Sequence, residues 1–313
     1  MSARVAITGS SGYLGSKLVE QALENGCSVF GIDIQPAIVQ EPSLTSICAD
    51  VSDESIAGHL VDFNPDVVIH AAFVFQPLRN QRLMRSRNIG GFETIAQAVS
   101  QVRPDKFHVV SSATVYGAHA NTGASLKENS PFRPTRFQYA ADKQAIEERL
   151  ERFAVANPKI KVSWSRPSLV GGPNIDNYMS RFLFGMPMMV LPDGNDTPLQ
   201  FVHENDAVDA IMKIIESGRT GPFNIGPSDA SPLSLIAEKS DRRSLSLPYW
   251  LCYSVHALAW YCRLPIHESP PSLLEYARHR WVVDSARLTQ ELGFQFQHSS
   301  DQTLDIMIDQ LLG

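Results

Sequence analysis

Two side chains four residues apart, Tyr139 and Lys143, have the types and spacing of an acid–base pair. They lie in the segment Tyr-Ala-Ala-Asp-Lys, within a stretch whose pattern predicts a helix, so both fall on one helical face. An ammonium beside a phenol favours the phenolate and lowers the pKa of the tyrosine. The tyrosine could then exchange a proton near neutral pH. Because Tyr-x-x-x-Lys is a common pattern, a surface pair without chemistry is the alternative.

A pair of hydroxyl side chains lies upstream, at the end of a short apolar run. Ser111 and Ser112 open the segment Ser-Ser-Ala-Thr-Val-Tyr-Gly, directly after residues 107–110. In open sheets of parallel strands, ligands bind in the crevice outside the carboxyl ends of the strands. We therefore expect the hydroxyl groups at this strand end to face the ligand crevice.

A glycine-rich segment near the N-terminus could bind the pyrophosphate of a dinucleotide. It reads Thr-Gly-Ser-Ser-Gly-Tyr-Leu-Gly, follows one predicted strand and opens one predicted helix, which is the context that such a site requires. The glycines let the backbone approach the phosphates, and the helix N-terminus offers free N–H groups. A tight structural turn is the alternative. The predicted cofactor-binding residues of this loop are Gly9, Ser11, Gly12, Tyr13, Leu14 and Gly15.

Two carboxylates follow later predicted strands. Asp33 ends the second strand, 18 residues after Gly15, where a carboxylate can accept hydrogen bonds from the adenosine ribose. A 2′-phosphate would meet a like charge there, and the next Arg or Lys in the chain is Arg79, so the sequence predicts NAD over NADP. Asp50, followed by Val51, could contact the adenine; a loop or capping role is the alternative for Asp50.

The elements that must position these residues alternate between strand and helix. Apolar runs without hairpin signals between them predict parallel strands joined by helical crossovers. The expected fold class is α/β, a Rossmann-type doubly wound parallel sheet with a smaller C-terminal substrate-binding region. The predicted strands are residues 5–7, 28–32, 48–51, 67–69, 107–110 and 162–165, and the predicted helices are residues 13–24, 84–102 and 138–156.

A change in composition divides the chain after about residue 167. Pro and Gly become frequent beyond Ser168, which predicts short elements interrupted by loops. We expect residues 1–167 to form an NAD-binding Rossmann domain with the catalytic Tyr and Lys. Residues 168–313 are expected to be mainly a substrate-binding region packed on the same core.

The bulk composition argues against several classes of function. The 313 residues are 43% hydrophobic and 19% charged, with a formal net charge of −6, so no basic surface for nucleic acid is indicated. The four cysteines lack the spacing of a zinc site, and no bound metal is predicted. The chain shows no secretory signal and no stable membrane span. The apolar segment 247–264 could be a lid, a core helix or a membrane-surface helix. We expect a cytoplasmic protein.

Taken together, these motifs resemble the extended short-chain dehydrogenase/reductase family, the NAD-dependent epimerases and dehydratases. The glycine loop has that family's Thr-Gly-x-x-Gly-x-x-Gly form, and the match continues through His-Ala-Ala, Ser-Ser-Ala-Thr-Val-Tyr-Gly, Tyr-x-x-x-Lys and Arg-Pro to weaker landmarks at residues 201–206, 223–226 and 292–294. By this resemblance the catalytic residues are Ser112, Tyr139, Lys143 and Asn88. It adds cofactor-binding residues to those above: His70, Ala71, Ala72, Ser111, Tyr139, Lys143 and Pro167.

The resemblance also implies a mechanism and an assembly. Tyr139 would exchange a proton with a substrate hydroxyl or carbonyl oxygen, Ser112 would hydrogen-bond the same oxygen, and Lys143 would lower the pKa of Tyr139 and hold the nicotinamide ribose. A hydride would pass between the NAD ring and the substrate carbon. A homodimer through residues 84–102 and 138–156 is expected.

The sequence is compatible with more than one class of substrate. Sugar-nucleotide enzymes of this family often carry an Arg just before the Phe-x-His segment, where this chain has Gln200, and an Arg-x-Gly-Asp-like segment, where it has residues 278–284. Arg278, Arg280 or Arg181 could still bind a phosphate. Many apolar and aromatic residues in the late region suggest a small or apolar alcohol or ketone. The alternatives are a nucleotide-sugar epimerase, dehydratase or reductase, and a regulator that binds NAD without catalysis.

Overall fold

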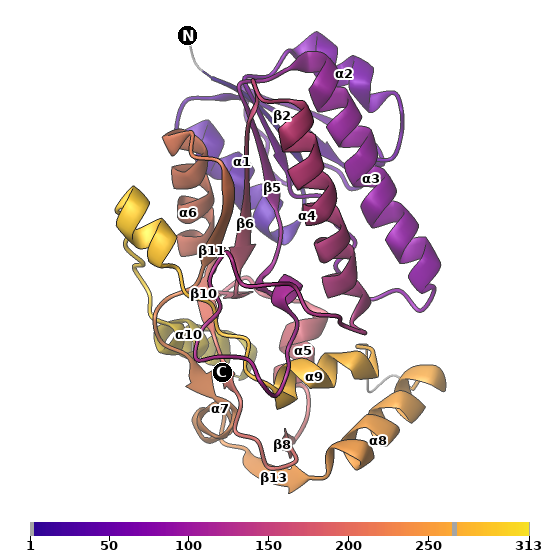
Figure 1. Ribbon diagram of the computed structural model, residues 1–313, viewed down its shortest axis with the longest axis vertical. Helices are drawn as coiled ribbons and strands as arrows, with labels where there is room; N and C mark the ends of the chain where they lie inside the picture. The colour runs from indigo at the N-terminus through magenta and orange to yellow at the C-terminus, as the bar shows by residue number, and fades with distance from the viewer. Residues whose placement is uncertain (1–2, 265–267, 313) are drawn as a thin grey trace. The chain divides into compact units, whose positions relative to one another are not determined.

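A computed structural model describes residues 3–264 and 268–312 (Figure 1). The chain forms two compact units, and each consists of several chain segments. The first unit comprises residues 1–111, 142–166 and 208–223, and the second comprises residues 112–141, 167–207 and 224–313. The expectation that residues 168–313 mainly bind substrate stays a prediction.

The first unit is built on a seven-stranded sheet with the strand order β11-β6-β5-β4-β1-β2-β3, and the pairings from β3 to β6 are parallel. This confirms the predicted fold class. Its strands are β1 (Arg4–Thr8), β2 (Ser28–Asp33), β3 (Leu44–Cys48), β4 (Val67–His70), β5 (Lys106–Val110), β6 (Lys161–Pro167) and β11 (Gly221–Ile225), of which β6 and β11 run on into the second unit. Its helices are α1 (Tyr13–Glu24), α2 (Ile56–Phe63) and α3 (Gln81–Val102), together with most of α4 (Gln138–Ala156) and α6 (Glu204–Ser217).

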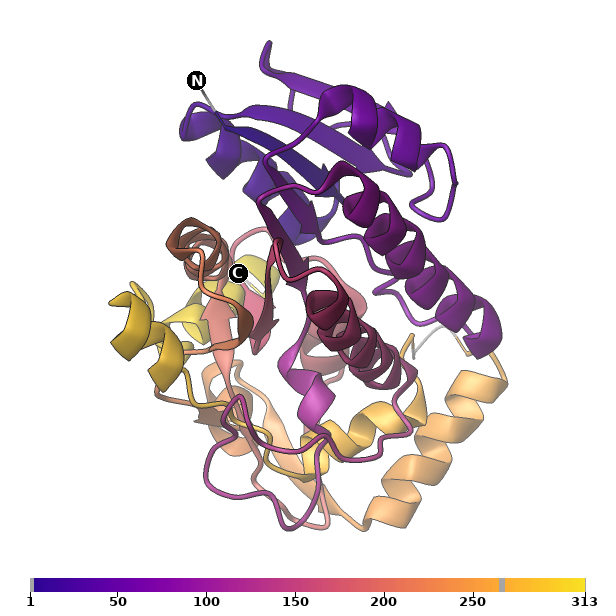
Figure 2. The same cartoon turned by 45° about the horizontal axis from the view of Figure 1, so that its top comes forward.

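Helices cover both faces of this sheet. Helices α2, α3 and α4 lie on one face, and α1 and α6 lie on the other (Figures 1 and 2). The apolar side chains under the first face form one buried cluster, which includes Phe30, Phe92, Phe107 and Trp164. Strand β1 lies between β2 and β4, so the order of strands reverses at its carboxyl end, where open α/β sheets bind their ligands.

The second unit consists of short elements joined by loops, as the density of Pro and Gly predicts. Three two-stranded sheets pair β10 with β7, β12 with β9, and β13 with β8. The strands are β7 (Leu169–Gly171), β8 (Met188–Pro192), β9 (Pro198–Leu199), β10 (Phe201–His203), β12 (Ser231–Pro232) and β13 (Arg243–Leu247). The helices and helical turns are η1 (Ala113–Tyr116), α5 (Tyr178–Phe184), α7 (Leu233–Lys239), α8 (Tyr249–Tyr261), η2 (Pro271–Leu273), α9 (Leu274–Arg278), η3 (Arg287–Glu291) and α10 (Ser300–Leu312).

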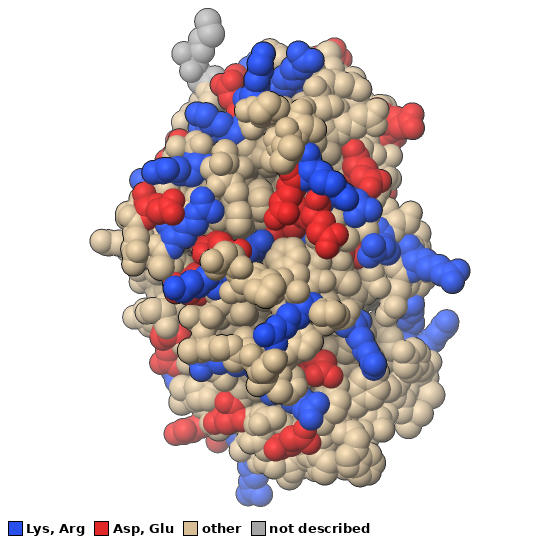
Figure 3. Space-filling model, in the orientation of Figure 1, with Lys and Arg blue, Asp and Glu red and all other residues tan. Residues whose placement is uncertain are grey.

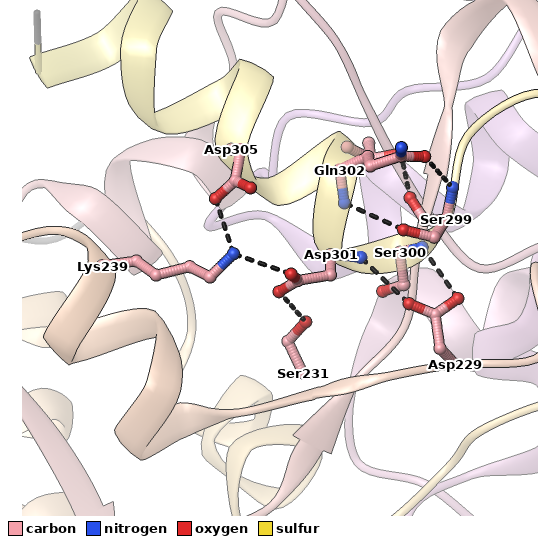
Figure 4. A network of polar contacts seen from close by, with 9 residues as sticks. Asp229, Ser231, Lys239, Ser299, Ser300, Asp301, Gln302 and Asp305 are labelled. Atoms are coloured by element: carbon pink, nitrogen blue, oxygen red, sulfur yellow. Dashed lines mark hydrogen bonds and ion pairs between the residues drawn. The ribbon is translucent and has the colours of Figure 1, made fainter.

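Helix α10 is fixed at its start by a network of polar side chains. The Asp229 carboxylate accepts hydrogen bonds from the backbone N–H groups of Ser300 (2.9 Å) and Asp301 (3.1 Å) (Figure 4). Lys239 of α7 bonds Asp301 (2.8 Å) and Asp305 (2.7 Å). The carboxylate satisfies backbone donors that a helix N-terminus otherwise leaves unpaired, and the lysine joins α7 to α10.

The surface carries charges of both signs. On the face in Figure 3, Lys and Arg side chains are interspersed with Asp and Glu, and no continuous basic surface forms on that face. Across residues 3–264 and 268–312, no helix combines the length and apolar composition needed to cross a bilayer.

Candidate active site

The glycine loop joins β1 to α1 in a conformation that excludes side chains. Gly9 has a φ of +72°, and a Cβ atom there would stand 2.6 Å from the backbone nitrogen of Ala72. A Cβ atom on Gly15 would stand 1.7 Å from the carbonyl oxygen of Gly9. Only glycine fits at these two positions, because the backbone packs too closely for any Cβ.

The N-terminus of α1 is open to an anion. Gly12 caps the helix without a side chain, and the first turn, which begins with Tyr13 and Leu14, holds no acidic residue. The helix therefore presents N–H groups and a partial positive charge at the switch point of the sheet. This arrangement suits a pyrophosphate.

Asp33 lies at the end of β2, directly beside the glycine loop. One carboxylate oxygen accepts a hydrogen bond from the backbone of Ser11 (2.9 Å), and the other accepts one from the backbone of Gln35 (2.9 Å). These bonds fix the orientation of the carboxylate while lone pairs remain for a ribose hydroxyl.

Asp50 lies two residues beyond β3, which ends at Cys48, earlier than the predicted strand 48–51. Its Oδ1 accepts hydrogen bonds from the backbone (2.9 Å) and hydroxyl (2.7 Å) of Ser52, and these bonds lower the pKa of this exposed carboxyl. Val51 is half-buried beside Gly91 of α3. A contact of Asp50 and Val51 with adenine stays a prediction.

His70 and Ala71-Ala72 form the turn after β4. The Nδ1 atom of His70 lies 2.8 Å from the Thr8 hydroxyl, and the Ala71 N–H donates to the Thr8 carbonyl (3.1 Å). Burial lowers the pKa of His70 to about 3, so the imidazole is neutral at physiological pH. This turn holds the carboxyl ends of β1 and β4 side by side.

Lys143 lies on α4 within the first unit and is almost fully buried. Its ammonium donates to the carbonyl of Val110 at the end of β5 (2.7 Å) and lies 3.8 Å from the centre of the Phe73 ring. Burial lowers its pKa to about 7, against the opposing attraction of Glu147 and Asp142.

Asn88 of α3 joins three segments of the first unit. Its Nδ2 donates to Asp142 of α4 (3.0 Å), and its Oδ1 accepts from the backbone of Val74 (2.8 Å), in the segment after β4. Asp142 also contacts Arg85 (3.2 Å). The structure therefore places Asn88 as a brace between the β4 loop and α4. The predicted ordering role of Asn88 remains a prediction.

Ser112 and Tyr139 meet in the second unit. The Ser112 Oγ accepts hydrogen bonds from the backbone (3.2 Å) and hydroxyl (3.0 Å) of Thr114, which leaves its own proton to donate to the phenol of Tyr139. Burial raises the pKa of Tyr139 to about 12, and the hydrogen bond from Ser112 opposes the rise. Tyr139 is therefore a phenol at neutral pH in this arrangement, and it needs a nearby positive charge to act as a base.

An aromatic wall leads from Tyr139 to an apolar cavity in the second unit. The ring of Phe137 lies 5.7 Å from that of Tyr139 and 5.5 Å from that of Tyr276. Tyr276 lines a cavity of ≈ 20 Å³, room for about one water-sized group. The other lining residues are Thr114, Leu169, Met179, Phe182, Leu183, Leu199, Leu273, Ala277 and Trp281.

The arginines considered for a phosphate have partners within the second unit. Arg181 pairs with Asp176 (2.5 Å) and Glu268 (2.8 Å). Arg278 pairs with Asp193 (2.6 Å) and lies over the ring of Tyr249.

Gln200 and Arg280 are the two remaining positions that the sequence analysis considered for phosphate binding. The Gln200 amide is buried and bonds the backbone of Pro227 and Val283, so it supports the fold at the position where the family often has an Arg. Arg280 is exposed.

Sequence reasoning missed the buried carboxylates of α4 and the aromatic contacts of Tyr276. Asp142 and Glu147 are both fully buried, although isolated Asp and Glu residues on a helix usually face water. One signal was available for Glu147, because it lies four residues after Lys143 and so shares its helical face.

A parallel sheet with a glycine-only turn, an open helix N-terminus and an oriented acidic residue defines a dinucleotide-binding Rossmann protein. Residues 5–226 match the family described as NAD dependent epimerase/dehydratase family. The match covers more than half of the chain, which therefore belongs to this family. The match confirms the predicted resemblance to this family and the predicted cofactor, NAD.

Several similar proteins are named as epimerases or dehydratases. The chain is 27% identical to a UDP-glucose 4-epimerase of Mycolicibacterium smegmatis, over 71% of this chain and 77% of that protein. It is 24% identical to a dTDP-D-glucose 4,6-dehydratase of Bos taurus, over 89% of this chain and 90% of the relative. The structure of Thermus thermophilus UDP-glucose 4-epimerase in complex with NAD has a TM-score of 0.76 at 21% identity, over 99% of both chains, and supports the fold.

Proposed function

We propose that this chain catalyses NAD-dependent hydride transfer at a carbon bearing a hydroxyl or carbonyl group, with Tyr139 as the general acid/base. The observation that carries the proposal is the hydrogen bond between Ser112 and Tyr139, with Lys143 one turn further along α4. Bound NAD would supply the hydride acceptor or donor. The glycine loop, the α1 N-terminus and Asp33 would hold it.

The chain's own residues would handle the proton. In reduction, the Tyr139 phenol would donate its proton to the carbonyl oxygen of the substrate, while Ser112 hydrogen-bonds the same oxygen. In oxidation, Tyr139 would take the hydroxyl proton, and the Lys143 ammonium on the next helical turn would stabilise the phenolate. Asn88 would keep α4 and the β4 loop in register through Asp142 and Val74.

For the substrate, we infer an apolar or modest-sized alcohol or ketone. The support is the apolar aromatic surface that Phe137 and Tyr276 form beside Tyr139, and the pairing of Arg181 and Arg278 with carboxylates. A nucleotide-sugar is the second candidate, because the named relatives act, by their names, on UDP-glucose and dTDP-glucose.

The first experiment is the nucleotide content of freshly purified protein, followed by assays at 340 nm. Net NADH formation with apolar alcohols supports the first substrate class. Near-stoichiometric bound NAD and conversion of UDP- or dTDP-sugars without net NADH would support the second instead.

The role of Tyr139 is tested by substitution. Tyr139→Phe should lower kcat by about 10²–10⁴-fold while NAD still binds through the glycine loop and Asp33, because general acid–base catalysis contributes about that factor. Tyr261→Phe, on the exposed side of α8, is the matched control and should leave kcat unchanged. If Tyr139→Phe keeps the biological activity of the protein although its turnover is lost, only a regulator that binds NAD without catalysis remains.

We further propose a homodimer through α3 and α4. Sedimentation at micromolar concentration should show a dimer, and a monomer alone would contradict this.

A further inference from the structure

Glu147 of α4 is a fully buried carboxylate with both oxygens engaged. Its Oε1 accepts hydrogen bonds from the Ser111 hydroxyl and from Nε of Arg166 (3.1 Å). Its Oε2 accepts from Nε1 of Trp164 (2.6 Å) and from Nη2 (2.6 Å) and Nε (3.0 Å) of Arg166. The carboxylate therefore ties the end of β5 and the strand β6 to α4.

Stability alone does not account for this arrangement. Replacing a buried ion pair with apolar side chains of similar size is often neutral or stabilising. Arg166 is 2% exposed and Glu147 0%, so the pair has lost the hydration of both ions. The buried carboxylate can therefore also act on a second buried positive group besides Arg166.

That positive group is Lys143, one helical turn before Glu147. Burial deprives the Lys143 ammonium of water and lowers its pKa to about 7, and the attraction of Glu147 is the largest opposing contribution, ahead of Asp142. At i and i+4, the two side chains share one face of α4.

The other ionisable groups around Lys143 in the first unit cannot replace this charge. The buried imidazole of His70 is neutral, because burial lowers its pKa to about 3. Asp142 shares its charge with Arg85 and accepts from Asn88. Arg166 is itself positive and directed at Glu147.

We propose that Glu147 is a positioning residue that keeps Lys143 protonated, with Arg166, Trp164 and Ser111 holding its carboxylate in place. The role rests on the proposed function, in which Lys143 must be a charged ammonium, not a neutral amine, to stabilise a phenolate at Tyr139.

Two double variants remove the charges without leaving one ion unpaired. Glu147→Gln/Arg166→Gln keeps polar groups in the site. Glu147→Leu/Arg166→Met replaces the pair with apolar packing and serves if the first variant does not fold. The matched control is Glu93→Gln/Arg149→Gln, which removes an exposed ion pair of 2.8 Å between α3 and α4.

The measurement is the protonation midpoint of Lys143 by NMR of protein labelled with ¹³C at lysine Cε. The chain has eight lysines, and the Lys143→Arg spectrum identifies the resonance. We expect a midpoint of about 7 in the unaltered protein. It should be lower by up to about one pH unit in both double variants, because the loss of the attraction of Glu147 is partly offset by the loss of the like charge of Arg166, and unchanged in the control.

A midpoint that stays within the control's range in a folded double variant would overturn the role of Glu147. The titration needs neither NAD nor substrate, so it can contradict the role of Glu147 without testing the proposed function. Intact turnover in Tyr139→Phe would overturn the function even where the midpoint shifts, and an unshifted midpoint would overturn this inference even where that turnover is lost.

Discussion

Two networks in this chain pair carboxylates with cations, an arginine in one and a lysine in the other, in opposite surroundings. In the first unit, Glu147 and Arg166 are 0% and 2% exposed. In the second unit, Lys239 is 22% exposed, and its partners Asp301 and Asp305 are 46% and 53% exposed (Figure 4). Distances are similar in the two networks, so burial is the difference that matters.

Exposure to water determines how much each network contributes to stability. Breaking a buried pair leaves an ion without hydration and costs several kcal/mol, whereas an exposed pair contributes about 0–1 kcal/mol. The Glu147 network therefore sets which arrangement of α4, β5 and β6 can exist, and with it the surroundings of Lys143. The Lys239 network adds a small stabilisation to the contact between α7 and α10.

The largest expected effect comes from breaking the buried pair on one side. Glu147→Ala should lower the free energy of unfolding by about 3–5 kcal/mol, because Arg166 stays buried without its partner. Urea denaturation measures the loss, and Glu147→Ala/Arg166→Met should recover most of it. A loss below about 1 kcal/mol in Glu147→Ala would remove the contrast between the networks.

Acid should weaken the first unit through two buried histidines. Burial lowers the pKa of both His70 and His108 to about 3, so both stay neutral in the folded state as pH falls below 6.5, while the unfolded chain takes up protons. The contribution of these two histidines to stability is fully present above about pH 6.5 and falls by about 1.4 kcal/mol per pH unit for each histidine down to about pH 3.

This pH dependence can be divided between the two residues. His108 bonds Ser163 (2.9 Å) and Ser165 (3.2 Å), and His108→Gln keeps a hydrogen-bonding group there. The histidine part of the slope between pH 6.5 and 5, measured by urea denaturation, should be about halved in this variant. An unchanged slope would show that His108 is not a buried neutral group.

A smaller effect is expected at the start of α10. Asp229→Ala should cost about 1 kcal/mol, since two backbone N–H groups lose their acceptor. Asp229→Asn should cost less. Hydrogen exchange should locate the loss at residues 300–303, and protection that is unchanged there would contradict the capping role.

The smallest effect is expected for the exposed cation. Lys239→Met should cost no more than about 1 kcal/mol. In 1 M salt, where the screening length is about 3 Å, the difference from the unaltered protein should vanish, while the loss in Glu147→Ala persists. A salt-independent loss in Lys239→Met would place this network closer to the buried one.

Local signals in the sequence predicted much of the first unit. The helices at 13–24 and 138–156 were predicted with the bounds that the structure shows for α1 and α4, and the glycine loop lies where predicted. Helix α3 begins at Gln81, three residues before the predicted start, because Asn80 caps it through the backbone of Leu83 (3.1 Å). The helix begins with two polar residues, Gln81 and Arg82, so its start could not be predicted from the apolar pattern.

Contacts distant in sequence could not be predicted in this way. From the sequence alone, Glu147 is expected to be an exposed charge. Its burial depends on contacts with Trp164 and Arg166 of β6. Helix α2 has only eight residues, and helix α6 and strand β11 follow the short elements and loops of residues 167–203, so their place in the first unit is decided by packing. The Tyr276 wall likewise joins residues more than 130 positions apart, since its hydroxyl bonds the carbonyl of Thr114 (2.9 Å).

The interleaving of the two units has a consequence for biosynthesis. The last segment of the first unit is residues 208–223, which supply most of α6 and the start of β11. A ribosome must therefore translate nearly three quarters of the message before the sheet can gain its final edge strand. Until then, the nascent chain carries β6 with one side unpaired, and a fragment ending at residue 167 would keep that open edge permanently.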